Sequence, residues 1–322
     1  MKARKRIAVL VAGESAETWR AEFASEFDVA LVTDDPAQLR SAVARSEVGA
    51  SAVAPGMDAV ALCNPLAGLG AQLELAEEFL RCGTDVLLLR PDMPHGIEGL
   101  GLVVRRIGGQ LLLSLPARRI SASVPAMKRL LDLLVSAAVL LAGAPLWLLI
   151  ATAVKIQDRG PVFFAQDRVG PGGRAFRFLK FRTMWPDADR HRAWYQARHG
   201  EPGRLFKLSQ DPRRTPVGRV LRRFSLDEVP QLLHVLSGRM ALVGPRPPLP
   251  AEIERYRPWQ RLRLRGWFGL TGLWQVCGRS EVRDLDDVVL LDTLYLQNAS
   301  LALDLRILLR TAHVVLSGRG AC

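Results

Sequence analysis

The segment from Leu130 to Pro161 reads LLDLLVSAAVLLAGAPLWLLIATAVKIQDRGP. Its uncharged part, Leu133 to Val154, has 22 residues. As a single helix this part would be roughly 33 Å long, enough to cross a bilayer core of about 30 Å. Pro145 lies near its middle, however, and would break such a helix. Basic residues flank both ends, so the rule that positive flanks stay in the cytoplasm gives no orientation for a spanning helix.

A break at Gly143 to Pro145 would account for these flanks. The two halves, Leu130 to Ala144 and Pro145 to Val154, are each too short to span a membrane. A helix broken at Pro145 can enter and leave on the same face, and basic residues at both ends are then expected. We therefore predict a re-entrant membrane helix over residues 130–156, with both ends in the cytoplasm.

The composition predicts contact with lipid and with an anionic partner. The chain has 322 residues, enough for two domains, and 49% of them are hydrophobic, which is high for a purely soluble protein. Its formal net charge is +12, and residues 155–265 alone hold 24 basic and 10 acidic residues. That excess fits a phosphorylated substrate, an acidic lipid or a nucleic acid. The four cysteines have no CxxC spacing, so neither a zinc site nor a disulfide framework is indicated.

Residues 1–124 alternate apolar bursts with amphipathic stretches, as in RIAVLVAG, DVALVT and AQLELAEEFLRCG. This pattern predicts an α/β domain with an open, Rossmann-like parallel sheet. No GxGxxG follows the first strand, so an accessory or scaffolding role is favoured over nucleotide binding. A linker rich in proline and serine then leads into a second domain, residues 125–322, for which we predict a mixed α+β fold.

Asp227 and Glu228, in RRFSLDEVPQLLHVL, are the main candidate catalytic residues. A helix could begin with Asp227 as its N-cap, or with Ser225 as the N-cap of a capping box that includes Glu228. In both registers the two carboxylates lie in the first helical turn, where the helix dipole and upstream arginines would keep them ionised. One could attack phosphorus while the other holds a metal. The alternative is that the pair only caps a helix.

Basic residues that could bind phosphate surround this pair in the sequence. Lys180 and Arg182, in LKFRTM, would share one face of a strand. Arg246 lies between prolines, which would hold its guanidinium in a fixed direction for a bidentate phosphate contact. His234, in QLLHVL, is predicted to be packed and not catalytic. The mixture of Arg and Trp in RPWQRLRLRGWFGL suits either single-stranded nucleic acid or lipid headgroups, and the nearby apolar segment favours the lipid.

Several motifs together resemble the bacterial sugar transferases, the monotopic polyprenyl-phosphate phosphoglycosyl transferases. They are KRLLDLL, GPVFFAQDRVGPGG, FLKFRTM, RRTPVGRVLRRFSLDEVPQLLHVLSGRMALVGPRP, GLTGLWQVCGRS and LYLQNASLALDLRILLRT, and they cover residue 126 to the C-terminus. Phe268, Ala241 and His234 depart from residues common in the family. Larger members, such as undecaprenyl-phosphate galactose phosphotransferases, carry a soluble domain before the catalytic one and begin with several spanning helices, which we expect this chain to lack.

The resemblance implies that a UDP-sugar loses UMP and that its hexose-1-phosphate passes to undecaprenyl or another polyprenyl phosphate. Asp227 would form a phosphosugar-aspartyl intermediate, and Glu228 would bind Mg2+. Lys180, Arg182, Arg222 and Arg246 would neutralise phosphate oxygens. The reaction would begin exopolysaccharide or O-antigen-type lipopolysaccharide assembly.

The resemblance also implies a location at the cytoplasmic face of the bacterial inner membrane, a possible homodimer and no nucleic-acid partner. Two alternatives stay open: a membrane-attached basic binding protein, and a degenerate transferase on which residues 1–124 are a regulatory module.

Overall fold

The structure of the chain is a computed structural model. It describes residues 5–11, 16–24, 26–48, 58–63, 69–89, 97, 99–100, 102, 104–107, 110–117, 120–121, 124–188, 190, 192–199, 211–278, 282 and 284–317. The chain divides into two compact units, with the boundary between residues 119 and 120. The two units are described separately below.

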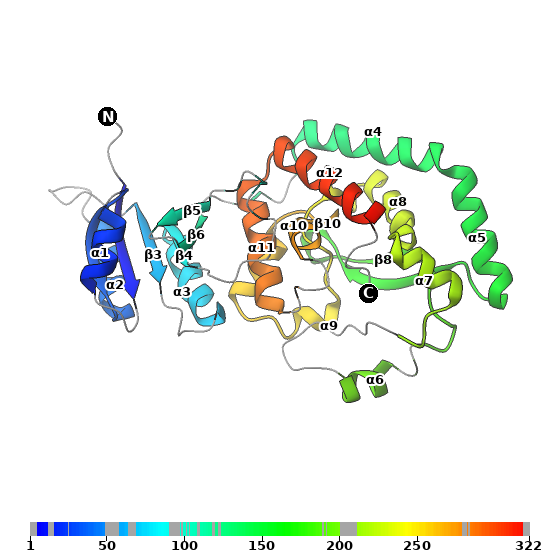
Figure 1. The fold of residues 1–322 in the computed structure, drawn as a ribbon, viewed down its shortest axis with the longest axis horizontal. Helices are drawn as coiled ribbons and strands as arrows, with labels where there is room; N and C mark the ends of the chain where they lie inside the picture. Colours follow the sequence, from blue (N-terminus) through cyan, green and yellow to red (C-terminus); the bar gives the residue numbers. More distant parts are fainter. Residues whose placement is uncertain are drawn as a thin grey trace. The chain divides into compact units, whose positions relative to one another are not determined.

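The first unit is a doubly wound α/β domain built on a six-stranded sheet of order β2-β1-β3-β4-β6-β5 (Figure 1). Its elements are β1 (Arg6–Val11), α1 (Ala16–Ala24), β2 (Asp28–Thr33), α2 (Pro36–Val48), β3 (Ala59–Cys63), α3 (Leu69–Arg81), β4 (Asp85–Leu89), β5 (Val104–Ile107) and β6 (Gln110–Leu115). β1 to β4 pair in parallel, which confirms the predicted parallel-rich sheet. β5 and β6 add an antiparallel hairpin at one edge that was not predicted.

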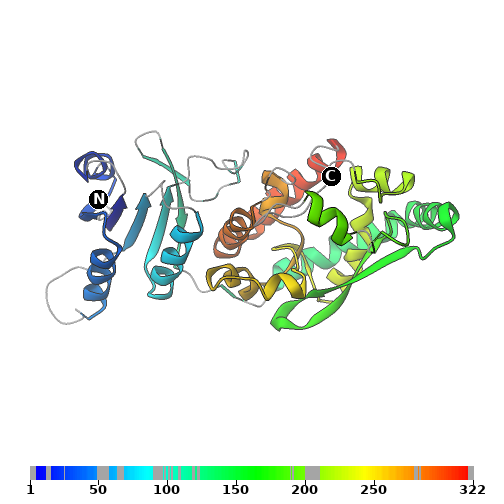
Figure 2. The same cartoon turned by 90° about the horizontal axis from the view of Figure 1, so that it is seen from below.

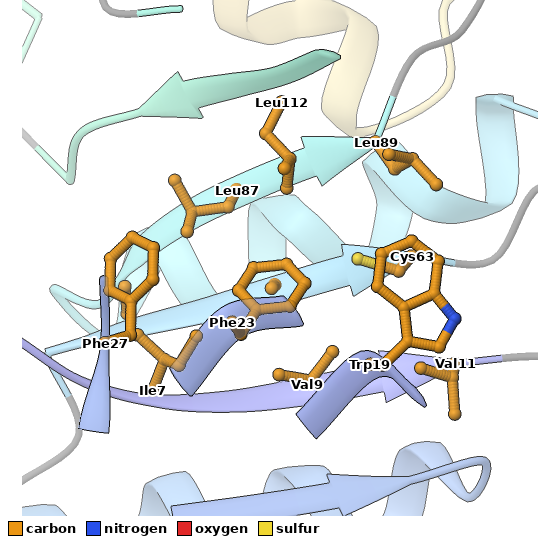
Figure 3. Close-up of a cluster of buried hydrophobic side chains, with 12 residues drawn as sticks. Ile7, Val9, Val11, Trp19, Phe23, Phe27, Cys63, Leu87, Leu89 and Leu112 are labelled. Atoms are coloured by element: carbon orange, nitrogen blue, oxygen red, sulfur yellow. The ribbon is translucent and has the colours of Figure 1, made fainter. Parts of the chain in front are cut away.

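Both faces of the central strands β1, β3 and β4 are buried, which explains their nearly continuous apolar runs. Alternate strand residues, such as Val9, Ala61 and Leu87, form one face and pack with Trp19 and Phe23 of α1 (Figure 3). α2 and α3 cover the opposite face, and Figure 2 shows them on the other side of the sheet from α1. Apolar burial on both faces is what holds this unit together.

The second unit is mainly helical and contains two small two-stranded sheets. Its elements are α4 (Ala126–Ala142), α5 (Ala144–Asp158), β7 (Phe163–Val169), η1 (Pro171–Gly173), β8 (Ala175–Phe181), α6 (Arg192–His199), α7 (Pro216–Arg223), η2 (Leu226–Gln231), α8 (Leu232–Leu236), β9 (Ala241–Val243), α9 (Pro250–Ile253), η3 (Trp259–Arg265), β10 (Gly269–Thr271), α10 (Leu273–Cys277), α11 (Leu285–Asn298) and α12 (Leu301–Ser317). β7 and β8 form an antiparallel hairpin, and β9 pairs in parallel with β10. The mixed helix and strand content agrees with the prediction.

α4 and α5 form the apolar segment and meet at a 64° bend, seen plainly in Figure 1. The break is at Gly143, and Pro145 lies in the first turn of α5, where its missing N–H costs no helical hydrogen bond. A Cβ at Gly143 would lie 2.3 Å from the Trp147 ring, so a larger residue there would require this ring to move. Among the described residues no single helix is long and apolar enough to cross a membrane, although the bent pair passes that test when taken together.

The second half of the bent pair is packed against the elements that follow it. Ile150 and Val154 of α5 share a buried cluster with Phe181 of β8 and Leu221 of α7. Leu226 and Val229 of η2 pack against the same cluster. α5 therefore supports the short helix that carries Asp227 and Glu228.

Gly218→Ala is expected to lower the thermal unfolding temperature. A Cβ at Gly218 would lie 2.1 Å from the carbonyl oxygen of Thr183, which also accepts the Thr215 amide at 3.0 Å. Forcing α7 away from Thr183 should cost about 1–3 kcal/mol, as overpacking usually does. Val220→Ala, at a side chain that is 56% exposed on the same helix, is the matched control. Equal unfolding temperatures for the two variants would show that this contact adapts without cost.

Candidate active site

The two candidate carboxylates lie in η2, directly after a residue in an uncommon backbone conformation. Ser225 precedes the helix with φ 53°, in the left-handed region, and its side chain makes no capping hydrogen bond. The structure thus uses Ser225 as the N-cap, without the capping box considered from the sequence. Asp227 and Glu228 both lie in the first turn, as predicted. Because η2 is a short 3-10 segment, any helix dipole there is small, and burial and the surrounding cations are the main influences on their charge.

Glu228 is held by two cations from distant parts of the sequence. Its Oε1 accepts a hydrogen bond from Lys180 Nζ at 2.9 Å and another from an Arg246 terminal nitrogen at 3.0 Å. Burial alone would raise the pKa of Glu228, but the charges and hydrogen bonds of Arg246 and Lys180 outweigh it and hold the pKa well below its usual range. Glu228 is therefore ionised at neutral pH.

Asp227 has a different environment from Glu228, although the two residues are adjacent in the sequence. Its side chain is buried, at 6% exposure, and no described residue donates a hydrogen bond to its carboxylate. Burial raises the pKa of Asp227 and the neighbouring negative charge of Glu228 adds to the rise, while Lys180, Arg222 and Arg246 oppose it. The two carboxylates thus have separate environments, as expected for groups with separate tasks.

An aromatic ring lies under the cations. The ring of Phe178, which is 1% exposed, has Lys180 Nζ and the Arg246 guanidinium each 5.7 Å from its centroid. The Arg168 guanidinium lies 5.4 Å from the same centroid. Cations over a ring face are stabilised by its quadrupole, more strongly where water is excluded. Phe178 therefore helps to keep three positive charges close together.

Arg222 and Arg182, the other predicted phosphate-binding residues, have different surroundings. Arg222 Nε donates to Thr183 Oγ1 at 3.0 Å, and its charge lowers the pKa of Asp227. The Arg182 guanidinium forms a two-point ion pair with Asp158 and also donates to the carbonyls of Pro161 and Met184. Arg182 therefore braces the end of α5 against β8, a role that was not predicted, and its contact with phosphate stays a prediction.

A cavity of about 550 Å³ lies next to these cations. Lys180, Arg182, Arg213 and Arg222 contribute positive charge to its wall, and Phe164 and Trp185 contribute aromatic surface. A volume of this size fits a small-molecule site, and the combination of arginines with aromatic rings suits an anionic ligand that carries a planar ring. Lys180 and Arg222 connect the cavity to the carboxylate pair.

The donor set fits a magnesium ion that arrives with phosphates. The described residues contain no group of three or more His, Cys, Asp or Glu side chains able to hold a metal alone. Mg2+ is usually bound through one or two carboxylates together with substrate phosphate oxygens and water. The adjacent carboxylates of Asp227 and Glu228 are hard oxygen ligands of that kind. Lys180 and Arg246, which occupy Glu228 Oε1, would meet the same phosphates.

Comparison with known sequences identifies the family. The sequence profile described as bacterial sugar transferase matches residues 123–318. The chain belongs to the bacterial sugar transferase family. The match covers the whole second unit except its ends, and includes every candidate site residue.

Three relatives of this sugar transferase show what the match covers. The galactosyl transferase CpsE of Streptococcus agalactiae is 44% identical over 186 residues, which are 56% of this chain and 41% of CpsE. The exopolysaccharide production protein ExoY of Sinorhizobium fredii is 43% identical over 198 residues, 60% of this chain and 87% of ExoY. The UDP-glucose:undecaprenyl-phosphate glucose-1-phosphate transferase of Caulobacter vibrioides is 41% identical over 202 residues, 61% of this chain and 72% of that protein.

Two buried residues shape the site of this sugar transferase without a sequence pattern that predicts it. One is Phe178, whose apolar character gave no sign of its contact with three cations. The other is Arg263 in η3, which is 4% exposed and donates to the backbone carbonyl of Arg246 at 3.0 Å. Arg263 also pairs with the buried Asp292 at 2.7 Å. An isolated arginine in a basic stretch carries no sequence signal for burial, so only the structure could find it.

Proposed function

We propose that the chain transfers a hexose-1-phosphate from a UDP-sugar to undecaprenyl phosphate, or to another polyprenyl phosphate, and releases UMP. Such a reaction would begin exopolysaccharide or O-antigen-type glycan assembly. The observation that carries the proposal is the buried Asp227 carboxylate, which accepts no hydrogen bond from the described residues and lies beside the cation-held Glu228. Membership of the family and the activities named for its relatives support the reaction class.

In the first step a carboxylate oxygen of Asp227 attacks the phosphorus that bears the sugar. The new bond joins this oxygen to phosphorus, and the phosphorus–oxygen bond to the uridine monophosphate breaks. UMP leaves with the electron pair as a stable phosphate anion, so no proton donor is required. A carboxylate that accepts no hydrogen bond from the protein keeps its lone pairs available for attack, which suits a nucleophile.

In the second step a phosphate oxygen of the polyprenyl phosphate attacks the same phosphorus. The bond to Asp227 breaks, the carboxylate is restored, and the product is a polyprenyl diphosphate sugar. Each step exchanges one phosphorus–oxygen bond for another. The two steps use one nucleophilic site in turn, so donor and acceptor need not be bound in the centre at the same moment.

The cations supply the electrostatic part of the reaction. Lys180, Arg246 and Arg222 place positive charge around the two carboxylates, where the phosphoryl oxygens would be bound. Transfer of a phosphoryl group depends mainly on positioning and on neutralising such oxygens. Glu228 would hold a Mg2+ ion, which would neutralise further charge on the diphosphate when bound. The cavity beside Lys180 and Arg222 would receive the nucleotide part of the donor.

A nucleotide-release screen tests the proposal. Purified protein in detergent is incubated with Mg2+, polyprenyl phosphate and one of several UDP-sugars: galactose, glucose or N-acetylated forms. We expect UMP release with one preferred donor, and turnover only when polyprenyl phosphate is present. Release of UDP would instead indicate direct transfer of the sugar, and no release of either nucleotide with any donor would refute the proposal.

We also propose that α4 and α5 enter the bilayer from the cytoplasmic face and return to it. The pair exposes large apolar side chains along both helices: Leu130, Leu134, Val139, Leu141, Leu146, Leu148, Leu149 and Ile156. A single-cysteine label can test the topology. Cys82 of the first unit is exposed, and a cysteine at Glu254 would report on the second unit. Both should react from the same side of membrane vesicles, whereas a spanning segment would separate them.

The double variant Leu148→Lys with Leu149→Lys is expected to leave the membrane fraction. These side chains are 71% and 65% exposed in α5. A lysine at membrane depth costs about 2.5–3.5 kcal/mol, so two should reduce partitioning by about 10³-fold or more. Trp194→Lys is the control, because it also replaces an exposed apolar side chain (54% exposed) by lysine but lies in α6, outside the helix pair α4 and α5. Cell fractionation measures the result, and unchanged membrane recovery of the double variant would exclude insertion of α5.

A further inference from the structure

His234 of α8 is buried and bonded to the strand that carries Lys180. The side chain is 4% exposed, which confirms the prediction that it is packed. Its Nε2 accepts the backbone amide of Leu179 at 3.1 Å. Among the described strands β8 pairs with β7 alone, so amides along its second edge need acceptors from elsewhere. His234 supplies that acceptor at the residue immediately before Lys180.

The imidazole also contacts the aromatic ring beneath the site cations. It stacks on Phe178, with the ring centroids 6.2 Å apart and the planes 14° apart. Phe176 packs edge-on against it at 5.2 Å. The same Phe178 ring lies near Lys180 and Arg246, the two groups bonded to Glu228. His234 thus supports both the backbone and the ring next to the cations.

These contacts require a neutral imidazole. An Nε2 that accepts a hydrogen bond carries no proton, so the proton must be on Nδ1. Burial lowers the pKa of His234, and the positive charge of Arg239 adds to the effect.

The elements packed around His234 carry more basic than acidic groups. These groups are Lys128, Arg129 and Asp132 of α4, Arg177 and Lys180 of β8, Asp227 and Glu228 of η2, and Arg239 after α8, and Lys128 is paired with Asp304. A proton on His234 would add one more positive charge beside the cations that contact Phe178.

We propose that His234 is a positioning residue of this active site: as a neutral acceptor it fixes β8 and Phe178, and so holds Lys180 and Arg246 on Glu228. Protonation would remove the acceptor from the Leu179 amide and repel the nearby cations. Lys180 would then lose its place beside Glu228, and transfer would slow as the pH falls. The inference rests on the proposed function, because the process that slows is sugar-phosphate transfer.

Two substitutions separate the acceptor from the shape of the side chain. His234→Gln keeps an oxygen near the position of Nε2 and cannot gain a charge, whereas His234→Leu fills the space without an acceptor. At mildly alkaline pH we expect His234→Leu to lower kcat by about 10- to 100-fold through displacement of Lys180, and His234→Gln to stay within about 3-fold of the wild type. Thermal unfolding of each variant identifies any loss of fold.

The acid side of the pH profile gives a readout that a purely structural role would not change. The wild type should lose kcat/KM through protonation of both Asp227 and His234, whereas His234→Gln should lose it through Asp227 alone and show a shallower limb. The inference would be overturned if His234→Gln lost kcat/KM at acid pH as steeply as the wild type does, or if folded His234→Leu kept full activity. Absence of UMP release from the wild type would instead refute the proposed function.

Discussion

Asp227→Asn is expected to lower sugar-phosphate transfer by about 10³-fold or more, the usual cost of removing a nucleophile. Asparagine has nearly the shape of aspartate, so the site should keep its form while losing the attacking oxygen. Incubation with labelled UDP-sugar in the absence of polyprenyl phosphate provides the sharpest measurement. The wild type should release UMP in proportion to enzyme and retain labelled phosphosugar on the protein, and the variant should do neither.

The same substitution should leave the fold as stable as before, or make it more stable. Because burial raises the pKa of Asp227, the folded protein binds this proton more tightly than the unfolded chain does. Stability contributed by this group is therefore lost as the pH rises through the raised pKa, and the ionised carboxylate is unfavourable at neutral pH. A neutral asparagine removes that cost. Glu254→Gln, at an exposed residue, is the control, and full activity of Asp227→Asn would assign the nucleophile elsewhere.

Local patterns in the sequence were enough to predict most of the first unit, but not the strands at one edge of its sheet. Alternating apolar and amphipathic segments identify β1 to β4 with α1 and α3, because each buries a continuous apolar face. The hairpin of β5 and β6 was missed although Gly108 and Gly109 between them form a two-residue turn signal. Its antiparallel edge position depends on pairing with β4, which no local pattern specifies.

At the site, the sequence correctly predicted that Asp227 and Glu228 lie together in a first helical turn, whereas their catalytic roles stay predictions. Contacts that depend on a partner far along the chain were not predicted. The Asp227 and Glu228 pair could be read from adjacent carboxylates in a basic stretch. Arg182 is an example of a contact that was not predicted. Alternation along a strand places it on the same face as Lys180, but β8 ends at Phe181 and the Arg182 guanidinium forms an ion pair with Asp158. The meeting of Lys180 and Arg246 on one oxygen of Glu228 is likewise a product of the tertiary fold.

Glu228→Gln is expected to lower transfer by about 10²- to 10⁴-fold, as loss of electrostatic preorganisation does in other enzymes. Glutamine keeps the shape of the side chain but lacks the charge that holds Lys180 and Arg246 together. The two cations would then repel each other beside Phe178 and move away from the phosphate position. If Glu228 also holds Mg2+, the remaining activity should require a higher Mg2+ concentration for half-maximal rate. The initial rate of UMP release over a magnesium series measures both effects.

The effect of Glu228→Gln on stability should be opposite to that of Asp227→Asn. The pKa of Glu228 lies well below its usual range, so its ionised form stabilises the fold above the ordinary carboxyl pKa, and this contribution is lost as the pH falls through the depressed value. Its neutral replacement should cost about 1–3 kcal/mol, because two cations lose their shared partner. Two neighbouring isosteric substitutions would thus both remove activity while moving the unfolding temperature in opposite directions. Equal shifts for the two variants would contradict separate environments, because burial disfavours the ionised form of Asp227 whereas Lys180 and Arg246 stabilise that of Glu228.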